Sequence, residues 1–490
     1  MIDLTLNKKT AFIAFAITIA YFSILRHGLS YTDDHIRIIT GNSLFLYVGR
    51  PIAEAMTLFA SWGKPVFDAS PLSQFIAIGA LVFFCIAYFN TISDIPAYIA
   101  ICASITIGLN PMIMENMSYK FDAAPMIVSL CLAAAPMYFP WTGVRYFLLT
   151  SFFLLLSFMT YQAGVSAFIA SVSGGIVISI LNNDDFKNYI RKTLVNALCL
   201  LFSGLLYKII IILFFNRFLY DGSWGGVHSK IVNTDNVIVS LYNNYIAYFY
   251  FIYENIINSP FGFSYITILL FFLFTVIFRL LDSDCIYQWY FKLPLLIFAI
   301  FVLITSPLGL QFILNSPVIQ PRTLYVFGLV TAILIYIGFR FHKYNIVKRV
   351  MILPIFTLLF QSLSFAFLVG NIQSQQNRWE SLIASSLVND LASASKAYGN
   401  KIQLQGTLKY SPESQLSISK YSLLNYIARY HIGDIWTFPA FLSSAGLKLD
   451  ILPSTPTFNG DKILLSNGLG YSIYRKDNDG TLLLVFEQLE

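Results

Sequence analysis

Residues 11–37 read AFIAFAITIAYFSILRHGLSYTDDHIR, and this stretch decides the architecture of the chain. Its first part, residues 11–25, carries no charge and, with its flanks, is long enough to cross about 30 Å of bilayer hydrocarbon as a helix. Four chemically active side chains follow almost at once: Asp33, Asp34, His35 and Arg37. Because charged groups beside a bilayer are costly, this cluster points to a ligand or a reaction.

The composition indicates that most of the chain lies in a membrane. Of 490 residues, 57% are hydrophobic and only 11% are charged, too few to cover a soluble protein. We expect roughly eleven membrane spans. They cover residues 10–27, 71–90, 95–110, 124–140, 145–161, 163–181, 193–215, 263–281, 292–310, 323–341 and 350–370. No small-residue cleavage site follows the first span, so we interpret it as a retained helix and not a signal peptide.

The placement of basic residues predicts the orientation in the membrane. One set of span ends carries Lys8, Lys9, Arg145, Lys187, Arg191, Lys192, Arg279, Lys292, Arg340, Lys343, Lys348 and Arg349. Basic residues accumulate on the cytoplasmic side, so the N-terminus is expected inside. An odd number of spans then places the C-terminal segment outside.

The composition becomes polar after Gly370, which divides the chain into a membrane domain, 1–370, and an outer domain, 371–490. The pattern predicts helices over 373–397 and 417–430 and a strand over 401–405. Residues 463–475 and 481–488 are expected to form a hairpin around Asp477-Asn478-Asp479-Gly480. The predicted fold is therefore mainly α, a polytopic membrane protein with a small α/β domain.

Two further outer loops contain charged residues. The loop over 28–70 includes Gly49-Arg50-Pro51, where proline at a helix start predicts a short helix along the membrane surface. The segment 110–122 packs an amide, a tyrosine and three charges between apolar helices: Glu115, Asn116, Tyr119, Lys120 and Asp122. A plain connection needs far less, so substrate contact is the favoured interpretation.

The pair Asp33 and Asp34 has two interpretations. A helix cap with a first-turn carboxylate would be a structural use. A carboxylate near a low-dielectric surface is also a suitable general base, because desolvation raises its proton affinity. One aspartate could cap while its neighbour reacts. A metal site of these two with His35 is not expected, because adjacent residues rarely converge on one ion.

The arginines Arg50 and Arg322 are candidates for binding phosphate, since a guanidinium offers forked donors. For Arg322 an interfacial anchor is an equal alternative. Five cysteines lie within spans or on the inner side, with no pattern for a disulfide or a metal: Cys85, Cys102, Cys131, Cys199 and Cys285. No nucleotide-binding or nucleic-acid-binding motif is present.

Together these motifs resemble a known family, the serotype-converting O-antigen glucosyltransferases of the glucosyltransferase II type, from enteric bacteria and their temperate phages. The resemblance covers about the first 340 residues. It is carried by Asp33-Asp34 with Arg37, Gly49-Arg50-Pro51, the block at 110–122, and Tyr161-Gln162 at an outer span end. Lys120 stands where arginine would be equally expected.

The resemblance implies a GT-C-type glycosyltransferase in the bacterial inner membrane with its C-terminal domain in the periplasm. An acidic residue of the first outer loop, Asp33 or Asp34, would be catalytic. Arg37, Arg50, Lys120 and Arg322 would bind the phosphate of a polyprenyl-phosphate glucose, and Glu115, Asn116, Tyr119, Asp122, Tyr161 and Gln162 would contact substrate. The acceptor would be O-antigen polysaccharide on lipopolysaccharide. No metal or other cofactor and no nucleic acid is expected, and membrane lipid is a partner.

Two other classes remain open at this stage. A transporter or flippase of lipid-linked sugars would also need many spans and phosphate-binding arginines, although transporters place substrate groups near the midplane. An accessory subunit could use the charged loops for ion pairs alone. Within the enzyme class, a different sugar or a different acceptor is the alternative.

Overall fold

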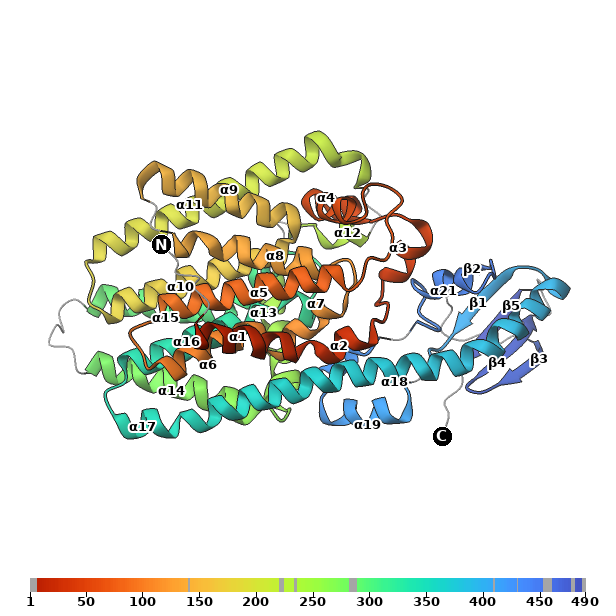
Figure 1. Ribbon diagram of the computed structural model, residues 1–490. Coiled ribbons are helices and arrows are strands. Elements are labelled where there is room, and N and C mark those ends of the chain that lie inside the picture. The colour runs from red at the N-terminus through yellow and green to blue at the C-terminus, as the bar shows by residue number, and fades with distance from the viewer. Residues whose placement is uncertain are drawn as a thin grey trace.

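The computed structural model describes residues 7–139, 142–219, 224–232, 236–281, 289–408, 410–429, 431–452, 461–476 and 481–486. Long helices form a bundle, and a small sheet stands at one end of it (Figure 1). The helices of the bundle are α1 (Lys8–Ala20), α2 (Phe22–His27), α5 (Leu72–Thr91), α6 (Ala97–Gly108), α8 (Ala123–Ala134), α9 (Gly143–Thr160), α10 (Ser166–Leu181), α11 (Phe186–Ile210), α13 (Val237–Ile252), α14 (Gly262–Leu281), α15 (Trp289–Thr305), α16 (Phe327–Phe341), α17 (Asn345–Val350) and α18 (Ile352–Tyr398).

Short helices and helical turns connect these long ones. They are α3 (Asp34–Thr40), η1 (Phe45–Val48), α4 (Pro51–Ala60), η2 (Pro111–Ile113), α7 (Met114–Ser118), η3 (Ala135–Tyr138), η4 (Gln162–Val165), η5 (Ile211–Phe215), η6 (Asn216–Phe218), α12 (Trp224–His228), η8 (Tyr253–Ile257), η10 (Ser306–Ile313) and η11 (Pro321–Thr323). The short helix expected after Arg50 is α4, which begins at Pro51.

Within the described residues, eight helical stretches are long and apolar enough to cross a membrane. They are Leu72–Thr91, Ala97–Ser118, Gly143–Thr160, Gln162–Leu181, Phe186–Phe218, Gly262–Leu281, Lys292–Ile313 and Asn345–Tyr398. Each overlaps one of the expected spans, which confirms a multi-pass membrane protein.

The remaining three expected spans, 10–27, 124–140 and 323–341, fall on shorter helices. The first is divided between α1 and α2 at Tyr21, and α8 has 12 residues before it continues as η3. Helix α16 has 15 residues and is buried from Gly328 to Phe339, so other helices cover it on every side. The total of eleven spans therefore stays a prediction.

Helix α18 connects the bundle to the sheet and is unusually long. Its 47 residues extend about 70 Å at 1.5 Å per residue. The expected span 350–370 and the expected polar helix 373–397 are both parts of it, so the expected boundary at residue 370 lies inside one helix. Gly370 allows α18 to touch α2 closely, because a Cβ there would lie 2.5 Å from the backbone carbon of Ser23.

The C-terminal domain contains α19 (Pro412–Lys420), α20 (Leu424–Ile427), α21 (Phe438–Ser444) and the strands β1 (Lys401–Gln405), β2 (Asp450–Leu452), β3 (Lys462–Gly468), β4 (Tyr471–Lys476) and β5 (Leu482–Phe486). The strand order is β2-β1-β5-β4-β3, with β1 parallel to both of its neighbours. Strands β3, β4 and β5 pair antiparallel. The expected α/β character and the strand 401–405 are confirmed.

Two details of the C-terminal prediction were wrong, and one strand was missed. The stretch 463–475 is two strands, because a turn at Leu469 and Gly470, with Gly470 at φ 76°, divides it. The helix expected over 417–430 is instead α19 and α20, separated near Tyr421. Strand β2 was missed, since three residues carry too little pattern to detect. The turn at 477–480 lies outside the described residues.

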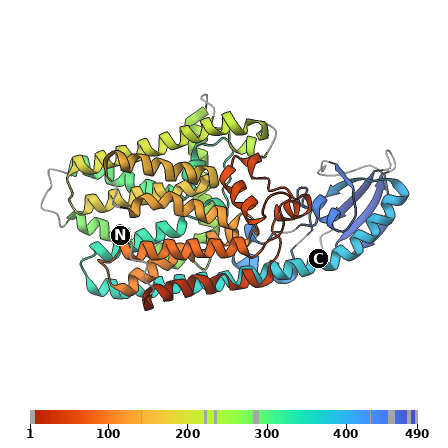
Figure 2. The same cartoon turned by 45° about the horizontal axis from the view of Figure 1, so that its top comes forward.

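The loops that follow α2, in residues 28–70, lie between the bundle and the sheet (Figure 1). Helices α3, α4 and α12 stand at the end of the bundle that faces the C-terminal domain (Figures 1 and 2). The hydroxyl of Tyr31 donates a hydrogen bond to the carbonyl of Tyr426 at 3.1 Å, and the rings of His35 and His431 lie 4.3 Å apart. The C-terminal domain therefore packs directly onto the charged cluster.

Candidate active site

The twelve residues expected to form a site come from loops that are distant in sequence, and most of them meet in two adjoining clusters. The first, which we call the Asp122 cluster, comprises Asp34, Arg37, Arg50, Asp122 and Gln162. The second, the Glu115 cluster, comprises Glu115, Asn116, Tyr119, Tyr161 and Arg322. Asp33 interacts electrostatically with Arg37 of the first and with Tyr119 and Arg322 of the second.

Asp34 is buried and holds two loops together. Its Oδ2 accepts hydrogen bonds from the backbone N–H of Tyr31 at 3.0 Å and of Lys120 at 2.9 Å. Its Oδ1 lies 3.6 Å from Nη1 of Arg37. Burial raises the pKa of Asp34 to about 7, against the opposing effects of Arg37 and the two backbone donors. This carboxyl group joins the start of α3 to the loop before α8, and it is 0% exposed.

Arg37 is the centre of the Asp122 cluster. Its Nη1 donates to Oδ2 of Asp122, and its Nε donates to the carbonyl of Ser43 at 2.8 Å. The guanidinium also lies over the ring of Phe45, 4.5 Å from the centroid. Burial opposes the charge, but the neighbouring carboxylates raise the pKa of Arg37 above its usual value. Its donors are directed at protein groups, so the side chain serves to position α3 against α8.

Arg50 extends this cluster toward the loop at residues 161–162. Its Nη1 lies 3.6 Å from Oδ1 of Asp122, and its Nε donates to Oε1 of Gln162 at 3.3 Å. The guanidinium stacks over the ring of Tyr161 at 4.4 Å. The amide of Gln162 in turn donates to the hydroxyl of Tyr207 at 2.8 Å. Tyr207 was not expected from the sequence because it lies within a plain apolar helix.

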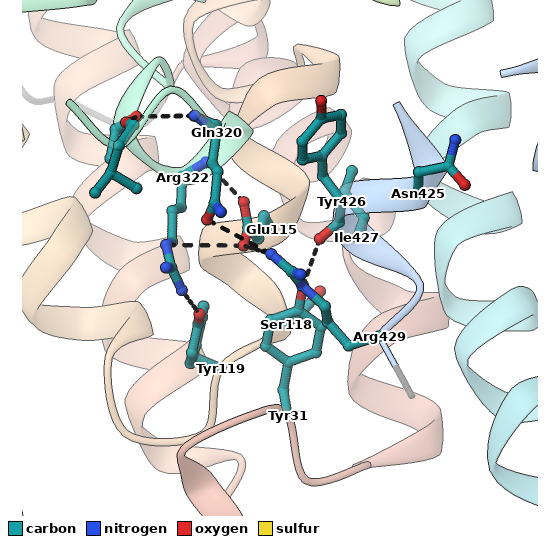
Figure 3. A network of polar contacts seen from close by, with 12 residues as sticks. Tyr31, Glu115, Ser118, Tyr119, Gln320, Arg322, Asn425, Tyr426, Ile427 and Arg429 are labelled. Carbon is teal, nitrogen blue, oxygen red and sulfur yellow. Dashed lines mark hydrogen bonds and ion pairs between the residues drawn. The ribbon is translucent and has the colours of Figure 1, made fainter. Parts of the chain in front are cut away.

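The Glu115 cluster is built around one buried carboxylate (Figure 3). Oε2 of Glu115 accepts the backbone N–H of Arg322 at 2.9 Å, and its Oε1 lies 3.9 Å from Nε of the same arginine. Nη1 of Arg322 donates to the hydroxyl of Tyr119. The carbonyl of Arg322 accepts bonds from Asn116 at 3.0 Å and from Tyr161 at 3.3 Å. Arg322 is therefore held by the site loops and not by lipid headgroups alone.

Asp33 has a different environment from its neighbour. It is exposed and stands at the N-cap position of α3, yet its side chain makes no capping hydrogen bond. The structural explanation as a helix cap therefore fails for Asp33. The preceding Thr32 has φ 41°, a conformation that β-branched residues rarely adopt. This turn leaves the Asp33 carboxylate exposed, and the carboxylate interacts electrostatically with Tyr119 and Arg322.

The side chain of Lys120 pairs outside both clusters, although its backbone N–H donates a hydrogen bond to Asp34. Its Nζ pairs with Oδ2 of Asp68 at 2.6 Å. Asp68 was not expected as a site residue, and the pKa of its carboxyl group is lowered because hydrogen bonds from Lys120 and Ser70 outweigh its partial burial.

Comparison with known proteins identifies the family. A family model described as glucosyl transferase GtrII matches residues 22–333, well over half of the chain. This chain belongs to the GtrII glucosyl transferase family. A relative from Salmonella phage P22, described as an uncharacterized 55.3 kDa protein in the gtrB 5′ region, is 24% identical over 241 residues. That match covers 49% of the chain and about half of the relative, 48% of its length. No solved structure matches the chain.

All twelve expected residues of this GtrII-family protein lie inside the matched segment, but one participant in the site does not. Arg429, which follows α20 in the C-terminal domain, places its Nη2 3.8 Å from Oε1 of Glu115 and 3.5 Å from Oε1 of Gln320. Sequence patterns could not identify it, since a lone arginine in a polar domain has no distinguishing neighbours. Only the return of the C-terminal domain onto the bundle brings it here.

The candidate ligands for a metal in this GtrII-family structure are its His, Cys, Asp and Glu side chains. Among the described residues, no group of three His, Cys, Asp or Glu side chains could hold a metal ion. Cys85, Cys102, Cys131 and Cys199 are free thiols, and Cys285 lies outside the described residues. The polar chemistry available in the described site is that of one exposed carboxylate, tyrosine hydroxyls and several guanidinium groups.

Proposed function

We propose that this GtrII-family protein transfers glucose, or a related hexose, from a polyprenyl-phosphate donor to a sugar hydroxyl of O-antigen. The reaction would take place at the periplasmic face of the bacterial inner membrane and invert the anomeric configuration. Family membership supports glucosyl transfer, and the phage relative's position beside gtrB supports a shared setting. The apolar helices support a lipid-linked donor, since both share the bilayer.

The observation that carries the mechanism is the contrast within the aspartate pair. Asp34 is buried and bonded to backbone donors, whereas Asp33 is exposed, makes no capping bond, and interacts electrostatically with Tyr119 and Arg322. We therefore assign Asp33 as the general base. It takes the proton of the acceptor hydroxyl as that oxygen attacks the anomeric carbon, and such a base contributes about 10² to 10⁴ in rate.

The leaving group is the polyprenyl phosphate. The bond between the anomeric carbon and the phosphate oxygen breaks with its electron pair, so negative charge grows on the phosphate. A guanidinium beside that oxygen stabilises the transition state more than the ground state. We assign this role to Arg322, because it interacts electrostatically with Asp33 and its side chain is 18% exposed, whereas that of Arg37 is 4% exposed.

The remaining residues have supporting roles in this proposal. Arg37 pairs with both Asp34 and Asp122, and these contacts position α3. Arg50 is shared between Asp122 and Gln162, and Lys120 is paired with Asp68. We therefore expect donor phosphate to contact Arg322 first, and we treat Arg37 as a positioning residue.

A transfer assay tests the proposal directly. Membranes or purified protein would be incubated with radiolabelled polyprenyl-phosphate glucose and isolated lipopolysaccharide. Transfer of label is expected for the wild type and a loss of about 10² to 10⁴ for Asp33→Asn. The matched control is Asp184→Asn, which removes an exposed carboxylate of another Asp-Asp pair and should leave transfer unchanged.

Two arms of the assay separate the alternatives. EDTA should leave transfer unchanged, because side-chain cations bind the leaving phosphate in the proposed mechanism. A transporter would move labelled donor across sealed vesicles without adding label to lipopolysaccharide. Wild-type protein that translocates the donor and never transfers the sugar would overturn the enzyme assignment.

A further inference from the structure

Arg429 belongs to the C-terminal domain, yet its guanidinium reaches into the Glu115 cluster. It stands opposite Arg322, with the Glu115 carboxylate between them (Figure 3). Its Nη2 is 3.8 Å from Oε1 of Glu115, which is an ion-pair distance and longer than a hydrogen bond. The position of Arg429 therefore needs a fuller explanation than a bond to Glu115.

Neutralising Glu115 does not account for two arginines. The backbone N–H and the side chain of Arg322 already approach this carboxylate. With Arg429, two guanidinium groups lie beside a single buried carboxylate. Nε of Arg429 is buried and has no hydrogen-bond partner among the described residues, whereas Oε1 of Glu115 is an acceptor that already lies within ion-pair distance of both arginines. A buried donor without an acceptor is unfavourable, so the cluster suits an added group that offers acceptor oxygens.

A phosphate fits the requirement for acceptor oxygens beside two guanidinium groups. A phosphate carries negative charge and several acceptor oxygens, and guanidinium groups match it with forked donors. Arg322 and Arg429 approach from different elements, so each could bind a different oxygen of one phosphate. Tyr119, whose hydroxyl contacts Arg322, and Tyr31, which packs on Tyr119 at 4.7 Å, line the same place.

Arg429 is held at this place by contacts of its own segment with the bundle and with helix α18. The Tyr426 carbonyl accepts a bond from Tyr31, and the Ile427 carbonyl accepts one from Gln373 at 3.5 Å. Ser422 donates to the carbonyl of Glu254 at 2.9 Å. The segment 422–429 is thus attached to the bundle at several points before its arginine enters the site.

We propose that Arg429 is a donor-binding residue whose guanidinium, opposite Arg322, binds the phosphate of the polyprenyl-phosphate sugar. The C-terminal domain then completes the donor site. This inference rests on the proposed function, because it takes the donor phosphate from it.

Binding of two lipids that differ only in the phosphate tests this inference. Polyprenyl phosphate and neutral polyprenol would be titrated against wild type, Arg429→Gln, Arg429→Lys and the control Arg378→Gln, an exposed arginine of α18. Arg429→Gln is expected to weaken polyprenyl phosphate binding at least tenfold with polyprenol unchanged. Arg429→Lys keeps the positive charge but lacks the forked donors of a guanidinium, so it should weaken polyprenyl phosphate binding less. Arg378→Gln should bind polyprenyl phosphate as tightly as the wild type.

The outcomes separate this inference from the proposed function. If the wild type binds both lipids equally, it does not recognise the donor phosphate, and the proposed function is contradicted. Wild type that prefers the phosphate while Arg429→Gln retains that preference within twofold would overturn only the role of Arg429. If Arg429→Gln does not fold, as judged by gel filtration, Arg429→Lys decides: a selective loss of phosphate affinity supports the role, and unchanged affinity overturns it.

Discussion

Two adjacent aspartates show how much a single position matters at the residue scale. Asp34 lies within the protein and Asp33 lies at its surface, because the left-handed turn at Thr32 and the start of α3 direct the two side chains differently. A sequence that reads Asp-Asp cannot state which one is buried. The structure shows that Asp34 is the buried one and Asp33 the exposed one, and the proposed mechanism gives the reactive role to Asp33.

Replacing Asp34 tests its structural role. Asp34→Asn keeps an oxygen that can accept the N–H groups of Tyr31 and Lys120, whereas Asp34→Ala leaves both without a partner. We expect the alanine variant to lose about 1–3 kcal/mol for each unpaired N–H and the asparagine variant to lose less. Thermal unfolding in detergent measures the difference. Equal losses in both variants would contradict this role.

The pH dependence of the same group has a defined sign. The pKa of Asp34 rises from 3.8 to about 7 on folding, mainly through burial. A raised folded pKa means that the contribution of this group to stability is complete below pH 3.8 and is lost as pH rises through about 7. Asp34→Asn should remove that component from the stability profile.

Replacing Arg37 tests the distinction between positioning and binding. Removing it leaves the buried carboxylates of Asp34 and Asp122 without their shared cation. Breaking a buried ion pair from one side costs about 3–5 kcal/mol, so Arg37→Gln should unfold at a clearly lower temperature. Arg322→Gln is the matched comparison, and it should lose transfer with a smaller change in unfolding temperature. If Arg37→Gln lost transfer with little change in unfolding temperature while Arg322→Gln unfolded at a much lower temperature, the two roles would be exchanged.

At the scale of elements, the contact between α2 and α18 sets where the C-terminal domain lies. Ser23 donates to the carbonyl of Phe367 at 3.0 Å, and Gly370 leaves no room for a side chain against the Ser23 backbone. Small residues permit such close helix approach. The direction of α18, and so the position of Arg429, depends on this contact.

Gly370→Val is therefore expected to separate α18 from α2. Because the obstacle is backbone, the added methyl groups cannot be accommodated by a rotamer change, and overpacking of this kind costs about 1–3 kcal/mol. We expect reduced transfer together with a lower unfolding temperature. Gly175→Val is the control, since a Cβ there meets nothing within 4 Å. Equal behaviour of the two variants would contradict the packing argument.

The contact between α3 and the C-terminal domain should depend on pH through His431. Burial, and secondarily His35, lowers the pKa of His431 from 6.5 to about 3. Lys120 also acts on His35, and the carboxylate of Glu380 accepts the backbone N–H of His431 at 2.8 Å. A lowered folded pKa means that stability is complete above pH 6.5 and is lost as pH falls toward 3.

Hydrogen exchange checks this dependence. Residues 424–442 should exchange faster at pH 5 than at pH 7.5 after correction for intrinsic rates. His431→Phe keeps a ring against His35 but cannot be protonated, so the pH difference should shrink. Identical protection of wild type at both values would rule out the histidine contact as the source.

At the scale of the whole molecule, the site and the C-terminal domain share one end of the bundle, while α17, with Lys348 and Arg349, lies at the other (Figure 1). We expect the site end to be periplasmic, because basic residues accumulate on the cytoplasmic side. A membrane-impermeant thiol reagent should label Ser444→Cys in intact spheroplasts and label Asn345→Cys only after lysis. Both positions are exposed in the structure, so the opposite result would reverse the orientation.

Hydropathy and local charge are properties of short segments, so the chain alone predicts the membrane class, eight of the spans, strand β1 and the polar loops of the candidate site. The folded structure is needed to find which aspartate is exposed, that Arg37 pairs with Asp122 and Lys120 with Asp68, and that Arg429 reaches Glu115 from the C-terminal domain. Burial and ion pairing depend on which distant segments meet. Here the long helix α18 and the docking of the C-terminal domain decide that, and neither leaves a periodic pattern in the chain.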